Sequence, residues 1–182
     1  MLSASKVLGS MRALKFKLKR STLNQIYISY MWPILEYASI VWDGCNDYEK
    51  DSLEKLEYEA ARVVTGLTRS VSIDRLLKEI GWLLLSERRR IQKLVTVYNI
   101  YHDNAPSYVA SLFPDSVADS TPYSLRNYNN YVTIDREQNF FSKSFIPSSL
   151  VLWNNLDQNI READTLYTLK SRLRNKFNRQ FS

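Results

Sequence analysis

The 182-residue sequence has few of the residues that carry covalent, redox or metal chemistry. It contains one cysteine, Cys45, and one histidine, His102. A single cysteine excludes an intramolecular disulfide bond and a thiolate zinc site within the chain, and it fits a reducing intracellular compartment, cytoplasmic or nuclear. No acid, cysteine or serine stands at a spacing from His102 that makes a catalytic triad or a metal site. We therefore interpret His102 as a helix-end histidine.

Motifs for phosphate binding and for catalysis are also missing. The sequence has no Walker-type glycine loop, no dinucleotide-binding fingerprint and no histidine-rich nuclease centre. It also has no Asp-Asp dipeptide, whereas nucleotide polymerisation needs closely spaced carboxylates that hold two divalent metals. We therefore expect no catalytic residue, no metal and no cofactor in this chain.

Long apolar runs are absent. The longest candidates are interrupted by Pro33, Asp43 and Glu79 and stay short of the roughly 18 residues that a membrane span requires, so we expect no membrane partner. With only 4 glycines, 45% hydrophobic and 13% aromatic residues, the composition favours a packed and mostly helical protein. The length suits one domain, or one domain with an appendage.

The clearest periodic stretch runs from Ser21 to Gly66. Apolar residues at steps of three and four predict a core-facing helix with this stripe: Leu23, Ile26, Tyr27, Tyr30, Met31, Ile34, Leu35, Ala38, Val41 and Trp42. Pro33 lies within the stripe and predicts a kink or break between Ser29 and Pro33. A polar turn and a second helix follow, for which Gly66 is the predicted C-terminal stop.

Further helices are predicted along the chain, and one segment lacks the helical period. The predicted helices are Ser3–Leu18, one capped by Ser72 and ending at Gly81, one capped by Ser86 and ending near Asp103, a short one beginning at Pro106, one capped by Ser148 or Ser149, and a last one capped by Asp164. Between Phe113 and Ser144 we expect irregular structure or a small β-hairpin pairing 131–134 with 140–146. The fold class is therefore a mostly α multi-helix bundle, with the irregular segment or hairpin around residues 113–147.

The net charge of +6 is unevenly distributed. Residues 1–35 carry six basic residues and no acid, residues 165–182 carry five and no acid, and the middle carries 14 basic residues against 19 acids. Basic ends around an acidic middle indicate a polyanion-facing surface made from the terminal helices. The candidate nucleic-acid-binding residues are Lys15, Lys17, Lys19 and Arg20, then Arg172, Arg174 and Lys176, with Arg88 and Arg89 as further candidates.

Two of these basic segments admit other interpretations. The segment Ser3–Leu18 is either a core helix with a solvated lysine face, a phosphate-contacting helix, or a mitochondrial presequence, because it is acid-free and contains serine. Arg88, Arg89 and Arg90 lie in the first turns of a predicted helix, where positive charge opposes the helix dipole. Successive helical residues point about 100° apart, so at most two arginines face one phosphate strand. The alternative, which we prefer slightly, is a solvated or salt-bridged cluster.

Seven short motifs occur in a fixed order from about Lys6 to Leu173. They are IYISYMWPILEYASIVWDGC, LEKLEYEAARVVTG, GWLLLSERRR, NAPSYVASLFP, YSLRN, SFIPSSLVLWNNL and LKSRL. In this order the chain resembles the C-terminal region, thumb and beyond, of jockey-like non-LTR retrotransposon reverse transcriptases. It departs from the family's pattern at Trp32, where a basic residue is frequent, and at Asp157, where proline is usual.

The resemblance implies a function as part of an RNA-directed DNA polymerase. It implies a helical thumb-like domain over residues 1–112, followed by a segment over 113–182 that ends in two helices packed on it. Such a thumb would hold an RNA/DNA template-primer duplex by its backbone, next to upstream palm and fingers domains that carry the catalytic carboxylates. The fragment is then inactive alone. A helical protein-interaction or structural module, or a non-functional remnant of a mobile element, stays open as the alternative.

Overall fold

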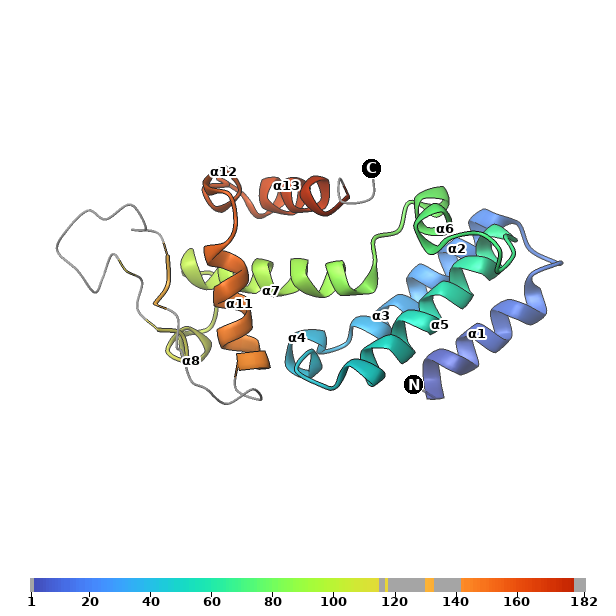
Figure 1. Cartoon of the computed structure of the whole chain (residues 1–182), viewed down its shortest axis with the longest axis horizontal. Coiled ribbons are helices and arrows are strands. Elements are labelled where there is room, and N and C mark those ends of the chain that lie inside the picture. The colour runs from blue at the N-terminus through green and yellow to red at the C-terminus, as the bar shows by residue number, and fades with distance from the viewer. Residues whose placement is uncertain (1, 115–116, 118–129, 133–141, 179–182) are drawn as a thin grey trace. The chain divides into compact units, whose positions relative to one another are not determined.

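The part of the chain that the structure describes is mostly helical. The computed structural model describes residues 2–114, 117, 130–132 and 142–178, and its regular elements over these ranges are helices, with no strand among them (Figure 1). The expected mostly α fold is thus confirmed. The chain divides into two compact units, which we call the N-terminal unit, ending at Arg88, and the C-terminal unit, beginning at Arg89.

The N-terminal unit is built around a long central helix, α5 (Asp47–Thr65), with shorter helices packed on it (Figure 1). These are α1 (Leu2–Leu14), α2 (Arg20–Ile26), the π-helix η1 (Tyr27–Met31), α3 (Trp32–Glu36), α4 (Ser39–Trp42) and α6 (Ile73–Ile80). Helices α1, α2 and α6 all lie against α5. Their apolar stripes meet in one core that includes Met11, Leu23, Tyr27, Val64 and Leu76.

Local sequence signals set the ends of α5 and α6. The Asn46 side chain accepts a hydrogen bond from the Glu49 amide at 2.9 Å, and the Ser72 hydroxyl accepts one from the Arg75 amide at 3.4 Å. Each helix stops at a glycine in the left-handed conformation, Gly66 with φ 77° and Gly81 with φ 75°, which glycine adopts without steric cost. The predicted cap at Ser72 and both predicted glycine stops are confirmed.

The predicted irregularity before Pro33 is a π-helical turn. The Trp32 amide donates to the Tyr27 carbonyl, a five-residue step in place of the usual four. Pro33 follows directly, in the first turn of α3, which continues from η1, so the wider turn lies where the proline has no amide proton to donate. The predicted single helix to Trp42 is wrong beyond Glu36, because the chain reverses at Tyr37 and at Ala38, which has φ 50°.

In its described residues, the C-terminal unit consists of helices, and its core is rich in aromatic side chains. Helix α7 (Leu85–Tyr101) contains the boundary at Arg88, and α8 (Ser107–Ala110), α11 (Phe145–Asn154), α12 (Gln158–Arg161) and α13 (Leu166–Asn178) follow. Leu94 and Tyr98 of α7 join Trp153 and Leu169 in its core. The division therefore falls within α7, and not near residue 112 as predicted, because these α7 side chains belong to the second core.

Three predicted helix starts were misplaced. Helix α7 begins at Leu85, one residue before Ser86; α11 begins at Phe145, three residues before Ser148; and the cap of α13 is Thr165, not Asp164, since the Thr165 hydroxyl accepts the Thr168 amide at 3.1 Å. For α11 and α13 a second residue of capping type, Ser144 or Thr165, stands within a few positions of the predicted cap. Residue type alone therefore could not decide which residue caps the helix.

The predicted hairpin is not found among the described residues. Phe145 and Ile146, expected in its second strand, lie in α11. Residues 133–141, which would have formed most of it, are outside the described part of the chain. Tyr131, expected in the first strand, instead pairs its backbone with the Asn154 side chain: its amide donates to Oδ1 at 3.0 Å and its carbonyl accepts from Nδ2 at 2.9 Å.

Candidate nucleic-acid interface

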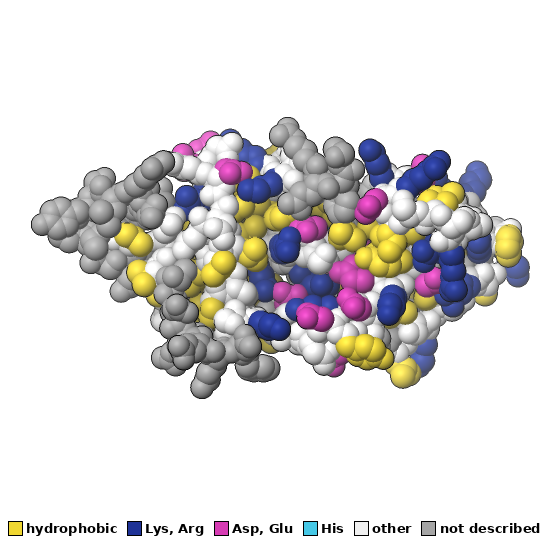
Figure 2. Space-filling model, viewed as in Figure 1, with side chains coloured by type: hydrophobic (Ala, Val, Ile, Leu, Met, Phe, Trp, Pro, Cys, Tyr) yellow, Lys and Arg dark blue, Asp and Glu magenta, His cyan; other side chains and the backbone are white. Residues whose placement is uncertain are grey.

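Basic side chains gather at one end of the N-terminal unit (Figure 2). This surface, here called the basic end, is formed by the end of α1, the α1–α2 link, the start of α2, the end of α5 with the segment after it, and α6 (Figure 1). Its basic residues are Arg12, Lys15, Lys17, Lys19, Arg20, Arg62, Arg69, Arg75 and Lys78, against three acids, Glu59, Asp74 and Glu79. The basic end thus carries a strong positive excess.

Three of the predicted lysines meet in the α1–α2 link. Helix α1 stops at Leu14 rather than at Leu18, and the amides of Lys17 and Leu18 both donate to the Leu14 carbonyl, at 2.9 and 3.0 Å. Lys17 and Lys19 are exposed and Lys15 is partly exposed. The structure therefore places these lysines together, but on a tight turn instead of around a helix. The expectation of a continuous helix to Leu18 was wrong.

Arg20 is also at the basic end, but it has partners. Its Nη1 lies 2.8 Å from Glu79 Oε1 and its Nη2 donates to the Glu79 backbone carbonyl at 2.7 Å. The guanidinium thereby ties the first turn of α2 to the last turn of α6. Arg20 positions the lysine link against α6, and it retains 45% side-chain exposure.

A cluster of arginines around Glu59 was not predicted. The Glu59 carboxylate lies 2.8 Å from Arg12, 3.2 Å from Arg62 and 3.2 Å from Arg69. Partial burial acts to raise the pKa of Glu59, but the three guanidinium groups outweigh it and hold that pKa below its usual value. Only the Glu59–Arg62 spacing of three residues on one helix was visible in the sequence. One carboxylate thus gathers three positive charges at the joint of α1 and α5.

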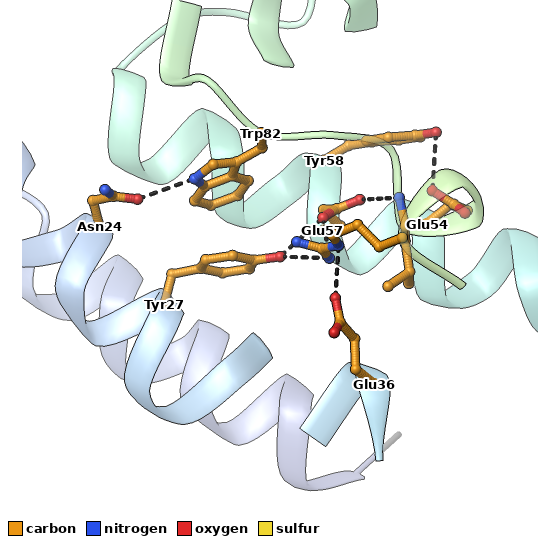
Figure 3. Close-up of polar contacts among 9 residues, drawn as sticks. Asn24, Tyr27, Glu36, Glu54, Glu57, Tyr58 and Trp82 are labelled. Atoms are coloured by element: carbon orange, nitrogen blue, oxygen red, sulfur yellow. Dashed lines mark hydrogen bonds and ion pairs between the residues drawn. The ribbon is translucent and has the colours of Figure 1, made fainter. Parts of the chain in front are cut away.

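Arg88 does not belong to any surface. Its side chain is 5% exposed, with Nη2 2.6 Å from Glu57 Oε1 and 3.1 Å from the Tyr27 hydroxyl, and Nε 2.8 Å from Glu36 Oε1 (Figure 3). The ring of Trp32 lies 4.2 Å from the guanidinium carbon. The predicted phosphate contact is therefore corrected: Arg88 is a buried, salt-bridged residue. The predicted phosphate contact of Arg89 is also corrected, because Arg89 is buried, with 3% exposure.

Glu57 is the acceptor at the centre of this interior cluster. It is fully buried, and besides Arg88 it accepts hydrogen bonds from the Tyr27 hydroxyl at 2.9 Å and from the Leu85 amide at 3.1 Å (Figure 3). Burial raises the pKa of Glu57 to about 7 although Arg88 opposes the shift, and burial with the Glu57 charge raises the pKa of Tyr27 above its ordinary value. Because Glu57 accepts the first amide of α7, it takes the place of the predicted Ser86 cap.

Aromatic rings complete the cluster. Tyr27 and Trp82 stack with centroids 3.7 Å apart, and Trp82 Nε1 donates to Asn24 Oδ1 at 3.1 Å (Figure 3). Glu57 is fully buried, and Trp82 and Arg88 are less than a tenth exposed. The cluster joins η1, α3, α5 and the start of α7.

In the C-terminal unit, two of the three predicted basic residues of α13 have partners and the third is exposed. Arg172 Nη1 donates to the Asn159 carbonyl, and Lys176 Nζ lies 2.9 Å from Asp157 Oδ2, so both side chains hold α13 to the segment around α12. Arg174 is exposed. Asp157, where the resembled family usually has proline, thus has a structural partner here.

Metal and histidine chemistry was expected to be absent. His102 follows the last residue of α7, and its amide donates to the Tyr98 carbonyl at 3.0 Å, so it is the helix-end histidine that was predicted. Across residues 2–114, 117, 130–132 and 142–178 no three metal-ligating side chains lie together. None of the helices in these ranges combines the length and the apolar character needed to cross a membrane.

No protein-family model, curated protein or solved structure matches the chain.

Proposed function

We propose that this chain binds the phosphate backbone of a nucleic acid through the basic end of the N-terminal unit. The observation that carries the proposal is the α1–α2 link, which presents Lys15, Lys17 and Lys19 within five residues and without an acid among them. Two of the three acids nearby, Glu59 and Glu79, are occupied by arginines. The lysine charges are therefore not neutralised locally, which is the condition for attracting a polyanion.

The resemblance in sequence supports a more specific proposal. The chain would be a non-catalytic C-terminal part of an RNA-directed DNA polymerase of the jockey-like non-LTR retrotransposon type. It would hold an RNA/DNA template-primer duplex beside palm and fingers domains contributed from elsewhere in a longer protein. The absence of paired aspartates from the sequence agrees with a role in holding the duplex and not in synthesis.

The test is the salt dependence of duplex binding. In the variant Lys15→Glu, Lys17→Glu, Lys19→Glu we expect the chain to stay folded, since these side chains lie on the surface, and the slope of log Kobs against log salt to fall by up to about 3 if each lysine contacts one phosphate. Arg20 is left unchanged because it ties α2 to α6. Fluorescence anisotropy with RNA/DNA and DNA duplexes at several salt concentrations measures the slope.

A variant with the same change of net charge provides the control. Lys6, Lys55 and Lys143 are exposed and lie outside the link, so their replacement by Glu alters the total charge equally. We expect this control to keep most of the slope. Equal losses in both variants would show that only net charge matters, and an unchanged affinity in the link variant would reject the assignment.

A second candidate function is a helical protein-interaction module. It is favoured by exposed apolar side chains along η1, α3, α4 and the start of α5, namely Tyr30, Tyr37, Val41 and Tyr48, which are 64 to 81% exposed. This function predicts no measurable salt slope with either duplex. It is therefore distinguished from backbone binding by the same titration.

A further inference from the structure

The most exposed large hydrophobic side chain of the described residues lies in the middle of the lysine link. Phe16 is 92% exposed, whereas its neighbours Leu14 and Leu18 pack against the core of the N-terminal unit. The hydrogen bonds of Lys17 and Leu18 to the Leu14 carbonyl close the turn on the C-terminal side of Phe16. The ring is thus held outward by an anchored turn, and it is not the end of a loose loop.

The surroundings of Phe16 are cationic. Lys15 and Lys17 are its direct neighbours, Lys15 Nζ lies 5.6 Å from the ring centroid, and Lys19 follows at the end of the link. An aromatic ring between lysines combines the two contacts that unpaired nucleic acid offers, a phosphate for each cation and a base face for the ring. A duplex interior offers only the phosphates at its surface, because its bases are already stacked on each other.

We propose, on the basis of the proposed function, that Phe16 stacks on an unpaired base of a single-stranded overhang, while the flanking lysines hold the adjacent phosphates. A membrane surface is the other polyanion that an exposed phenylalanine among lysines fits. It is disfavoured because Leu14 and Leu18 are used in the core, so one ring alone would insert, and stable membrane attachment needs more than one weak signal.

The experiment compares two DNA ligands of equal phosphate number: a blunt duplex, and a duplex with a short single-stranded overhang that carries 2-aminopurine at the junction. We expect the wild-type chain to bind the overhang ligand more tightly and to change the 2-aminopurine fluorescence. Phe16→Ala should weaken binding to the overhang ligand by about tenfold, the loss expected for one base-aromatic stack, and leave the blunt duplex unaffected.

Three companion variants identify the contact. Phe16→Trp keeps a stacking face and should retain the preference, whereas Phe16→Leu keeps apolar volume without an aromatic face and should lose it. Tyr48→Ala removes an aromatic side chain that is 79% exposed but lies between Asp47 and Glu49, so it should change neither ligand.

The results separate this proposal from the proposed function. If Phe16→Ala binds the overhang ligand like the wild-type chain while the Lys15, Lys17, Lys19 variant loses both ligands, stacking is refuted and backbone binding stands. If the wild-type chain binds neither ligand, both proposals fail. If the wild-type chain binds anionic phosphatidylserine vesicles and Phe16→Ala abolishes that binding alone, the ring serves a membrane and the stacking proposal is overturned.

Discussion

Replacing Arg88 with methionine tests the interior cluster of the N-terminal unit. Methionine keeps much of the aliphatic stem, so the change removes mainly the charge and its hydrogen bonds. The lost contacts are those to Glu57 at 2.6 Å and to Glu36 at 2.8 Å, from carboxylates that are 0% and 12% exposed, and the stacking on Trp32 at 4.2 Å. The buried Glu57 carboxylate and the mostly buried Glu36 carboxylate would then lose the cation that they share.

The expected loss is large compared with the stability of a small protein. Removing one partner of a buried ion pair costs about 3–5 kcal/mol, and whole domains are stable by only about 5–15 kcal/mol. We therefore expect Arg88→Met to lower the unfolding free energy of the N-terminal unit by about 4 kcal/mol. Urea unfolding followed by circular dichroism measures this loss as a lower midpoint at an unchanged slope.

Two further variants make the measurement specific. Lys55→Met removes a charge of the same sign from an exposed position on α5 and should cost no more than about 0.5 kcal/mol. Adding Glu57→Gln to Arg88→Met removes the stranded carboxylate, so the double variant should be less destabilised than the sum of the single ones. An Arg88→Met loss below about 1 kcal/mol, or strict additivity, would refute the role assigned to the cluster.

Three other predictions concern charge and backbone. Folding raises the pKa of Glu57 from 4.5 to about 7. The contribution of Glu57 to the free energy of unfolding is therefore greatest below pH 4.5, falls as the pH rises to about 7 and is constant above. Glu57→Gln should reduce the change of unfolding free energy with pH between pH 4.5 and 7. Ala38→Gly should stabilise the chain by about 0.5–1 kcal/mol and Gly66→Ala should destabilise it by about 1 kcal/mol, since their φ angles are 50° and 77°; thermal unfolding measures both. Glu59→Gln should increase the affinity for duplex DNA at low salt in a titration, because it removes the acid that three arginines share.

Features that depend on neighbouring residues were predictable from the sequence. The stops at Gly66 and Gly81, the cap at Ser72 and the irregular turn before Pro33 follow from the chemistry of a few adjacent residues. The end of α1 was not predictable, because Leu14 and Leu18 have the spacing of one helical stripe and both pack against the core. The Leu18 amide even keeps the helical hydrogen bond to Leu14, so periodicity gave the correct packing and the wrong helix length.

Pairings across long sequence separations were not predictable. Arg88 and Glu57 are 31 residues apart, and Arg12 and Glu59 are 47 apart. A run of three arginines indicates positive charge, but whether that charge faces water or a buried carboxylate depends on which acids the fold brings to it. For Arg88 those acids are Glu36 and Glu57, which the sequence placed on separate helices without showing that they converge.

The arginines and the lysines of the basic end differ in their contacts. Arg12, Arg20, Arg62 and Arg69 each contact a carboxylate, whereas Lys17 and Lys19 make no hydrogen bond or ion pair with side chains of the described residues. This follows from the groups themselves, since the planar guanidinium matches a carboxylate with two donors and the ammonium is a strongly hydrated point charge on a flexible stem. The arginines therefore fix the surface and leave its lysines available. A count of basic residues overstates the number that can contact a phosphate, and the link lysines are the ones to which the salt slope should respond.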